Sequence, residues 1–498
     1  MSNNYLNQPT TAFDSIPQAS ESNPAYSNFP ISGGEVDNLF ELARRFPNSY
    51  FQKLKEVRTR AREFADKYIR PVAGEIDRKV ARDHSYFSWD LMKEACNYRF
   101  FSLIIPEAFD GQGAGVLHMA AMAEELAVGC AGIASTIGVH SAGISCGLLS
   151  LDPYVLEKYI RPVAKAEKKG EPILWGGAVT EPWAGTDIWD EDFLDQAKIV
   201  TFAKKVPGGY KITGRKCFIS NGSVARYFAL AAALDPKAVR ESWTIFLVDA
   251  RSPGFSIGRV EHKMGQRASP AAELILEDVL VPDHCKIGLA GKAGWYVSIY
   301  LAGSRGPVGA IGIGCARRSL ECLMEWARLK KNRRGRLIDQ QAIQLVIARM
   351  SGEIASARML YVASALACDL IFYEMIGKPL HKAALRLLPK SLLAKKPFKE
   401  IVGSDRVKKA ADGFLAKTVP EDRLAFISRL ATAAKCIGSE TGVRVSGEAA
   451  RIMGPDAFDP RWPVEKAYRD AKLTMIYEGT NQANQITHFK DLARTWRS

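Results

Sequence analysis

Glu478 is a carboxylate whose neighbours in the sequence could give it a chemical role. Ile476 and Tyr477 precede it and Gly479 follows, in the stretch Ile-Tyr-Glu-Gly-Thr. Apolar neighbours could hold the carboxylate partly out of water, and desolvation raises the pKa of a carboxyl group toward working pH, as a general base requires. Gly479 has no side chain and could let a ligand come close. Taken alone, Glu478 is better explained as a surface glutamate near a helix start, favoured there by the helix dipole.

A glycine-rich stretch, AGSRGPVGAIGIG, runs from Ala302 to Gly314. It follows no predicted strand and lacks the Lys-Ser/Thr pair of a phosphate-binding loop, so we do not interpret it as a nucleotide site. Glycines at this spacing allow helices to approach closely, and we expect a tight helix contact here.

The hydrophobic periodicity divides the chain into helical, strand-rich and again helical parts. Apolar residues recur at spacings of three and four from about 36 to 165, and long helical patterns return after about 294. Between them lie short β-rich runs separated by Gly and Pro turns. We predict an α+β fold with an N-terminal helical domain, a central antiparallel β-barrel or sandwich, and a C-terminal helical bundle. The domains are placed at 38–168, 169–290 and 291–498, after a polar extension at 1–37 that we expect to be mobile.

Composition excludes several classes of protein. A chain of 498 residues is longer than one hydrophobic core supports, since a core stops growing near ~250–300 residues. No run of about 18 apolar residues appears, so we expect no transmembrane helix. The nine cysteines are scattered, odd in number and without a CxxC pair, which argues against a metal site and fits reduced thiols in the cytoplasm. The first residues show neither a secretory nor a mitochondrial targeting pattern.

The positive charge of the chain is concentrated in one segment. Residues 371–418 hold eleven Lys or Arg and four Asp or Glu, so their net charge of +7 (11 − 4) is half of the formal +14 of the whole chain. Prolines cut the segment into short amphipathic pieces, which could lie on an anionic membrane surface. The alternative, which we favour, is a solvated helical insertion whose leucines pack on the domain.

Four motifs, in this order along the chain, resemble the acyl-CoA dehydrogenase family. The resemblance covers about residues 40 to 494, with 371–418 as an insertion. The motifs are Val179–Asp187, Tyr210–Gly222, His262–Pro282 and Trp462–Gln482. A single short motif would mean little, but four in the right order and on the right kinds of element are specific.

The resemblance implies a FAD enzyme that removes two hydrogens from an acyl-CoA thioester. Glu478 would take the α-proton, the backbone N–H of Glu478 would polarise the thioester carbonyl, and flavin N5 would accept the β-hydride. The electrons would pass to an electron-transfer flavoprotein. Because members of the family share FAD between subunits, a homotetramer or at least a dimer is implied.

The resemblance also implies the residues that contact the ligands. The expected FAD contacts are Val179, Thr180, Gly185, Thr186, Phe218, Ser220, Lys330, Asn332, Gln341, Gly454, Thr480 and Gln482. The expected substrate contacts are Thr186, Arg305 and Gly479.

Several of these positions depart from the family pattern. Phe218 replaces a usual Trp, Lys330 replaces a usual Arg, and Gly454 keeps one glycine of a Gly-Gly turn. Gly138, at the expected floor of the acyl pocket, predicts room for a long, branched or cyclic acyl group.

Three other functions share this fold or these features. An acyl-CoA oxidase would use the same base and cofactor with oxygen as acceptor. A DNA-binding alkylation-response flavoprotein would use the basic surface, but it would need no base at Glu478, so we expect no nucleic acid partner. The third is a catalytically silent scaffold attached to a membrane through 371–418.

Overall fold

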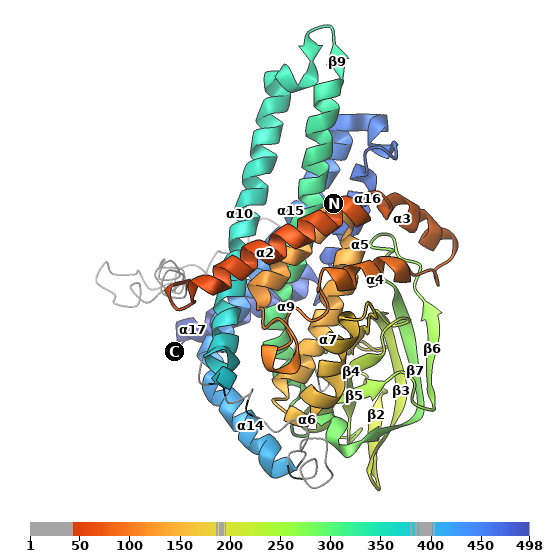
Figure 1. Cartoon of the computed structure of the whole chain (residues 1–498), viewed down its shortest axis with the longest axis vertical. Coiled ribbons are helices and arrows are strands. Elements are labelled where there is room, and N and C mark those ends of the chain that lie inside the picture. Colours follow the sequence, from red (N-terminus) through yellow and green to blue (C-terminus); the bar gives the residue numbers. More distant parts are fainter. Residues whose placement is uncertain are drawn as a thin grey trace, which may run out of the picture.

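The computed structural model describes residues 43–185, 188, 194, 196–378, 381–383, 387, 401 and 404–497. The expected mobile extension at 1–37, and much of the basic segment at 371–418, lie outside these residues. Helices form the N-terminal part, a mostly antiparallel sheet the middle and long helices the C-terminal part (Figure 1). The predicted α+β fold class is therefore confirmed.

The N-terminal part is built around α5, a helix that is buried on nearly all sides. Its helices are α2 (Asn48–Phe64), α3 (Ala73–Arg82), α4 (Trp89–Asn97), α5 (Val116–Leu149), α6 (Pro153–Val155) and α7 (Arg161–Glu167). The start of α5 is capped from far along the chain, because Asp369 accepts hydrogen bonds from the backbone N–H groups of Val116 and Leu117. Burial raises the pKa of this carboxyl group to about 6.

The middle part is one eight-stranded sheet with the order β6-β7-β3-β2-β4-β5-β8, and β1 pairs with β4. Its strands are β1 (Trp175–Ala178), β2 (Phe202–Val206), β3 (Gly209–Ser220), β4 (Tyr227–Ala233), β5 (Trp243–Asp249), β6 (Phe255–Val260), β7 (Ala271–Pro282) and β8 (Lys286–Ile287), with the short helix α8 (Val239–Ser242) between β4 and β5. The predicted antiparallel pairing dominates, although β1 and β2 each pair with β4 in parallel.

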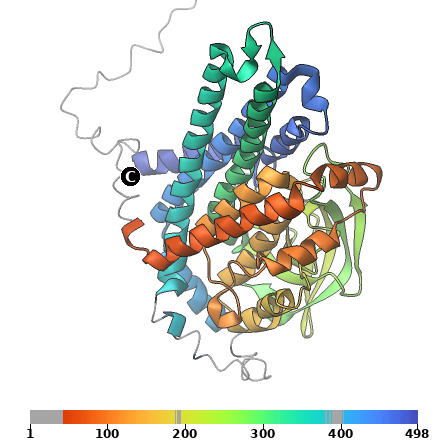
Figure 2. The same ribbon diagram turned by 45° about the horizontal axis from the view of Figure 1, so that its top comes forward.

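The C-terminal part consists of long helices that pack on α5 and on one another. They are α9 (Ala293–Leu329), α10 (Gln341–Phe372), α14 (Asp405–Thr418), α15 (Glu421–Met453), α16 (Val464–Thr474) and α17 (Asn481–Arg497). The ends of α9 and α10, joined by the hairpin β9 (Lys331–Asn332) and β10 (Gly335–Arg336), project beyond the rest of the molecule in both ribbon views (Figures 1 and 2).

The glycines of α9 let it cross α15 with almost no space between the two backbones. A Cβ added to Gly309 would lie 2.3 Å from the carbonyl oxygen of Ala434, and one added to Gly438 would lie 2.6 Å from Gly309 Cα. Backbone atoms cannot move aside as a flexible side chain can. The expected tight helix contact is therefore present.

Two helices are long and apolar enough to span a membrane by length and composition alone, Val116–Leu149 and Gln341–Met375. In the fold, 94% and 67% of their most apolar windows are buried. Both are explained as core helices, although the sequence led us to expect no such segment.

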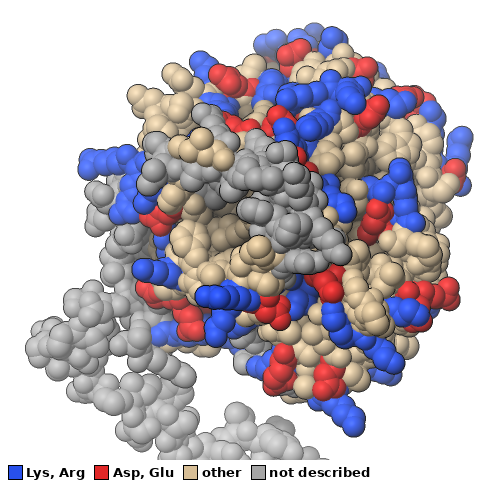
Figure 3. All heavy atoms as spheres, turned by 60° about the horizontal axis from the view of Figure 1, so that its bottom comes forward, with Lys and Arg blue, Asp and Glu red and all other residues tan. Residues whose placement is uncertain are grey.

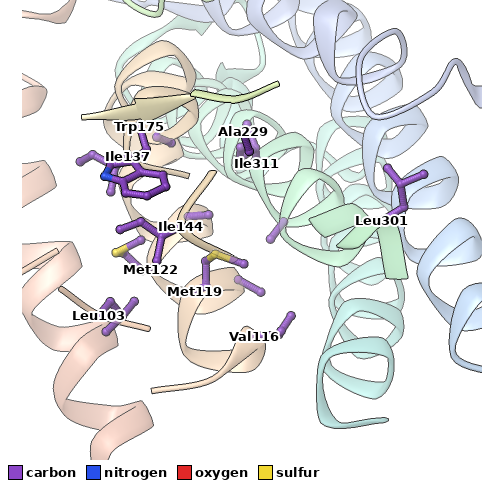
Figure 4. Close-up of a cluster of buried hydrophobic side chains, with 14 of the residues drawn as sticks. Leu103, Val116, Met119, Met122, Ile137, Ile144, Trp175, Ala229, Leu301 and Ile311 are labelled. Atoms are coloured by element: carbon purple, nitrogen blue, oxygen red, sulfur yellow. The ribbon is translucent and has the colours of Figure 1, made fainter. Parts of the chain in front are cut away.

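Buried hydrophobic side chains gather where α5 meets the sheet and α9, and they include Ile137, Trp175 and Ile311 (Figure 4). His140 of α5 is fully buried beside them. The backbone N–H of Trp175 donates to His140 Nδ1 at 3.2 Å, so Nε2 carries the proton and donates to the carbonyl oxygen of Phe101 at 2.9 Å. Burial lowers the pKa of His140 to about 4, because the charged imidazolium would lose its hydration.

Gly438→Ala is expected to lower the melting temperature, because the new methyl group would overlap the backbone of α9. Overpacking of this kind costs about 1–3 kcal/mol. Gly413→Ala on α14 is the matched control, since a Cβ there meets no atom within 4 Å, and it should leave stability unchanged or raise it by up to about 1 kcal/mol. Equal melting temperatures for the two variants would contradict the close crossing.

His140 is expected to lower the free energy of unfolding of the protein as the pH falls. Its folded-state pKa of about 4 lies below its ordinary value of 6.5, so the unfolded chain takes up a proton between these values and the folded chain does not. This contribution is absent above pH 6.5 and costs about 2 kcal/mol at pH 5. Urea unfolding at pH 7 and pH 5 should show that His140→Gln, which can still donate and accept, loses less stability than the wild type. An equal loss in both proteins would refute the assignment.

Candidate active site

Glu478 lies in the turn between α16 and α17, and the backbone of this turn is unusual. Glu478 has φ 57° and Gly479 has φ 78°, so two consecutive residues are left-handed. A non-glycine residue adopts this conformation only where its surroundings impose it, at a cost of roughly 1–3 kcal/mol. The contacts that impose it are therefore part of the site.

Side chains from three helices hold the carbonyl groups of this turn. Asn484 Nδ2 of α17 donates to the carbonyl oxygens of Glu478 and Gly479 at 3.2 and 2.8 Å, and to that of Thr480 at 2.9 Å. Lys435 Nζ of α15 donates to the Gly479 carbonyl oxygen at 2.8 Å. Arg305 Nε of α9 lies 3.5 Å from the Glu478 carbonyl oxygen, a long contact. The carbonyl groups of the turn thus point toward two buried cations.

The amide groups of the same turn are left available. Across the residues that the structure describes, neither the N–H of Glu478 nor that of Gly479 has a hydrogen-bond partner. A free N–H beside a carboxylate is the arrangement that can bind the oxygen of a carbonyl group while its neighbour takes a proton.

The carboxylate of Glu478 is held by two hydroxyl groups of α9. Tyr300 Oη donates to Oε1 at 2.7 Å, and Ser304 Oγ donates to Oε2 at 2.8 Å. Burial, and then the charge of Glu478, raise the pKa of Tyr300 well above its usual range. The same two causes raise the pKa of Cys146, on α5, to about 12. Both groups therefore stay protonated beside the carboxylate.

The cations near the turn are poorly solvated. Burial lowers the pKa of Arg305 to about 10 and that of Lys435 to about 8. In the described part of the chain, no lysine or arginine forms an ion pair with the Glu478 carboxylate. The positive charge thus acts on the backbone of the turn, and the carboxylate keeps only neutral hydrogen-bond donors.

Small residues of α5 face this carboxylate and leave space beside it. Ser135 Oγ lies 3.3 Å from Tyr477 Oη, next to Glu478 in the chain. One turn farther along α5, a Cβ added to Gly138 would meet no atom within 4 Å. The larger acyl pocket expected from Gly138 stays a prediction, with open space at the position where it requires space.

The loop after β1 and the strand β3 bring together Val179, Thr180, Gly185 and Phe218. Cys217 N donates to the Thr180 carbonyl oxygen at 3.0 Å. Lys216 Nζ donates to the Val179 carbonyl oxygen at 3.0 Å. Ser220 ends β3. Thr186 lies outside the described residues.

A buried ion pair fixes this loop against β3. Lys216 Nζ lies 2.7 Å from Glu181 Oε1, and both side chains are fully buried. The other oxygen of Glu181 accepts hydrogen bonds from the backbone N–H groups of Val200 and Thr201. Removing one partner of such a pair leaves an uncompensated charge, so the loop is strongly tied to the sheet.

Phe218 lies two residues after Lys216 of this ion pair, and its side chain is exposed to solvent. Its φ is 57° and 60% of its surface is exposed, and Trp183 of the loop is 67% exposed. A left-handed phenylalanine facing solvent costs backbone strain and gains no burial. A flat aromatic ligand stacked on this face would explain both features, so these residues fit the isoalloxazine ring of FAD.

The expected phosphate contacts lie at the far end of α9. Lys330 Nζ forms an ion pair with Asp456 at 2.7 Å, next to Gly454 in the chain. Asn332 is in the hairpin, where it bonds Gln340, and Gln341 begins α10. Lys330 lies 25 residues (330 − 305) beyond Arg305, or about 37 Å along a helix axis.

The structure therefore places Lys330 far along α9 from Arg305, the residue of this helix that contacts the Glu478 turn. A ribityl chain is too short to span ~37 Å of helix. Thr480 and Gln482, by contrast, lie at the start of α17 near Glu478, where Thr480 Oγ1 accepts from Ala483 N at 3.2 Å.

Sequence reasoning missed five residues of this site, which are Cys146, Tyr300, Ser304, Lys435 and Asn484. Lys435 is an isolated charge in the apolar run Ala-Thr-Ala-Ala-Lys-Cys-Ile-Gly, and Tyr300 and Ser304 are hydroxyls four residues apart on one predicted helix. These signals could have marked the residues as candidates, but not their partners.

The comparisons with known proteins agree with this arrangement. The chain matches three families, described as the N-terminal domain (residues 52–167), middle domain (176–279) and C-terminal domain (292–372 and 407–490) of acyl-CoA dehydrogenase. It is 27% identical over 460 residues to the acryloyl-CoA reductase (NADH) of Anaerotignum propionicum, covering 91% of this chain and 98% of that protein.

Solved structures show the same fold. Butyryl-CoA dehydrogenase from Megasphaera elsdenii superposes with a TM-score of 0.70 at 25% identity, over 90% of this chain and 99% of that one. A chain from a study of the electron transferring flavoprotein of Acidaminococcus fermentans gives a TM-score of 0.70 at 24% identity, with the same coverage. The chain thus belongs to the acyl-CoA dehydrogenase family of FAD-dependent oxidoreductases.

Proposed function

We propose that this protein dehydrogenates an acyl-CoA thioester between its α- and β-carbons, with Glu478 as the base. The observation that carries the proposal is the geometry of one residue. A half-buried carboxylate and a backbone N–H without a partner both belong to Glu478. The left-handed conformation directs the carbonyl group of Glu478 away from them, toward Asn484 and Arg305.

Each group of the turn has its own role toward the substrate. The N–H of Glu478 binds the thioester oxygen and stabilises the negative charge that grows there as the α-proton leaves. The carboxylate accepts that proton. Gly479 has no side chain, and a Cβ there would lie 3.1 Å from Asn484 Nδ2, so a larger residue would press on the donor that holds the turn. Bound FAD supplies the acceptor for the hydride of the β-carbon.

Two copies of the chain would hold each FAD. Val179, Thr180 and Phe218 of one copy fit the ring, while the basic hairpin around Lys330 of a second copy would bind the diphosphate. The long distance along α9 supports this division, and a homotetramer or dimer follows from it. We also propose an electron-transfer flavoprotein as acceptor; transfer to oxygen would instead indicate an oxidase.

The basic surface remains a separate matter. On the face shown in Figure 3, lysines and arginines are spread over the surface. Acidic side chains are interspersed among them, which is typical of a solvated protein surface.

Glu478→Gln should abolish turnover and keep binding. Mixed anaerobically with a panel of acyl-CoA compounds, the wild-type protein should lose its yellow flavin colour with at least one of them. The variant should bind the same compounds but react at least about 100-fold more slowly, because a general base contributes about 10²–10⁴. Glu465→Gln, which alters an ion pair of α16, is the control. Rapid bleaching by Glu478→Gln would rule out the assigned base.

Lys435→Met should slow the reaction by removing a donor to the Gly479 carbonyl. Small misplacements of a catalytic group cost up to about 100-fold in rate, so we expect flavin bleaching to slow by about 10- to 100-fold with little change in acyl-CoA affinity. Lys408→Met is the matched control. Lys408 of α14 is also buried, its pKa is also lowered to about 8, and it donates to a backbone carbonyl group outside the Glu478 turn. A wild-type bleaching rate in Lys435→Met would show that the turn does not need this donor.

A further inference from the structure

The two oxygens of the Glu478 carboxylate are bound by hydroxyls from a single helix face. Tyr300 and Ser304 are four residues apart on α9, so their side chains lie one above the other. Each donates to a different oxygen, at 2.7 and 2.8 Å. Two donors on separate oxygens fix the plane of a carboxylate, which one donor cannot do.

The contact of Tyr300 with the carboxylate is less readily explained by local helix geometry than that of Ser304. A serine hydroxyl on a helix often bonds the carbonyl one turn earlier, as Ser298 does with Gly294 at 3.0 Å. The phenol of Tyr300 reaches past the helix backbone to the carboxylate of another element, α16–α17, 178 residues away in the chain. Its pKa, raised by burial and by Glu478, keeps it a donor at any working pH.

The other charged and titratable groups around Glu478 do not replace this contact. They are Cys146 from α5, Arg305 from α9, Lys435 from α15, Asp491 from α17 beside Arg305, and Tyr477 of the same turn. Burial raises the pKa of the Cys146 thiol to about 12, so it stays neutral. Arg305 and Lys435 contact backbone carbonyls of the turn.

We propose that Tyr300 is a positioning residue for the base, whose hydroxyl, together with that of Ser304, fixes the orientation of the Glu478 carboxylate along the face of α9. The inference rests on the proposed role of Glu478. Donors to a carboxylate favour its charged form. Neutral donors do so without the strong stabilisation of a cation, which would leave the carboxylate too weak a base. Removing the Tyr300 hydroxyl should therefore change both the orientation of the carboxylate and the pH dependence of its proton transfer.

The test measures proton transfer separately from hydride transfer. The holoenzyme is incubated in deuterated buffer with an acyl-CoA that has α-hydrogens and no β-hydrogen, so that dehydrogenation is impossible. Deuterium entering the α-carbon then reports the base alone. In Tyr300→Phe, the acid limb of the exchange rate should move to higher pH by about one unit, since a hydrogen bond to a charged group contributes about that much.

Tyr296→Phe is the matched control. Tyr296 lies one turn before Tyr300 on α9 and its hydroxyl also donates to a carboxylate, that of Asp412. This variant loses a comparable bond away from the base, and its exchange profile should overlay that of the wild type. Ser304→Ala removes the donor to the other oxygen without opening a large cavity, and should move the acid limb in the same direction even where Tyr300→Phe folds poorly.

The outcomes separate this inference from the proposed function. Exchange by Glu478→Gln at the wild-type rate would overturn the role of Glu478 itself. Loss of exchange in Glu478→Gln, with acid limbs in Tyr300→Phe and Ser304→Ala that overlay the wild type, would overturn only the role of Tyr300. A shift in Tyr296→Phe equal to that in Tyr300→Phe would also overturn it, because the effect would then be general to α9.

Discussion

The site depends on a backbone turn that would not form by itself. Glu478 and Gly479 are both left-handed, and the bonds from Lys435 and Asn484 to their carbonyl oxygens compensate for the strain. A turn of this shape points the carbonyl groups to one side, and within the described residues it leaves the N–H groups of Glu478 and Gly479 without a partner. The helices α9, α15 and α17 can be understood as the frame that keeps these donors in place.

The helices α9 and α15 also keep their buried cations away from the Glu478 carboxylate, which suits a general base. Arg305 and Lys435 are buried deeply enough that their own pKa values fall, and both face the backbone of the turn. The carboxylate meets the hydroxyls of Tyr300 and Ser304 instead. A cation bonded directly to the carboxylate would hold it ionised too firmly to accept a proton. Positive charge nearby, but not in contact, still favours the negative charge that develops on a substrate.

The sequence was sufficient for the fold class, and insufficient for the side chains that surround Glu478. Helical spacing and the glycines of α9 are local patterns, and they predicted the helical domains and the crossing with α15. The contacts of Tyr300 and Lys435 join residues 178 and 44 positions apart, and no periodicity encodes such pairs. Phe218 was predicted at the flavin, but its exposed left-handed conformation, two residues after the buried Lys216, follows from no local sequence pattern.

The length of α9 has a consequence for the cofactor. One end of this helix carries Arg305 at the reaction centre, and the other carries Lys330 in a hairpin beyond the body of the molecule (Figure 2). On our proposal that two copies share each FAD, one α9 would contact one flavin near Arg305 and a second flavin near Lys330. Flavin occupancy then becomes a property of the assembly, and dilution that parts the subunits would release the coenzyme in the same step.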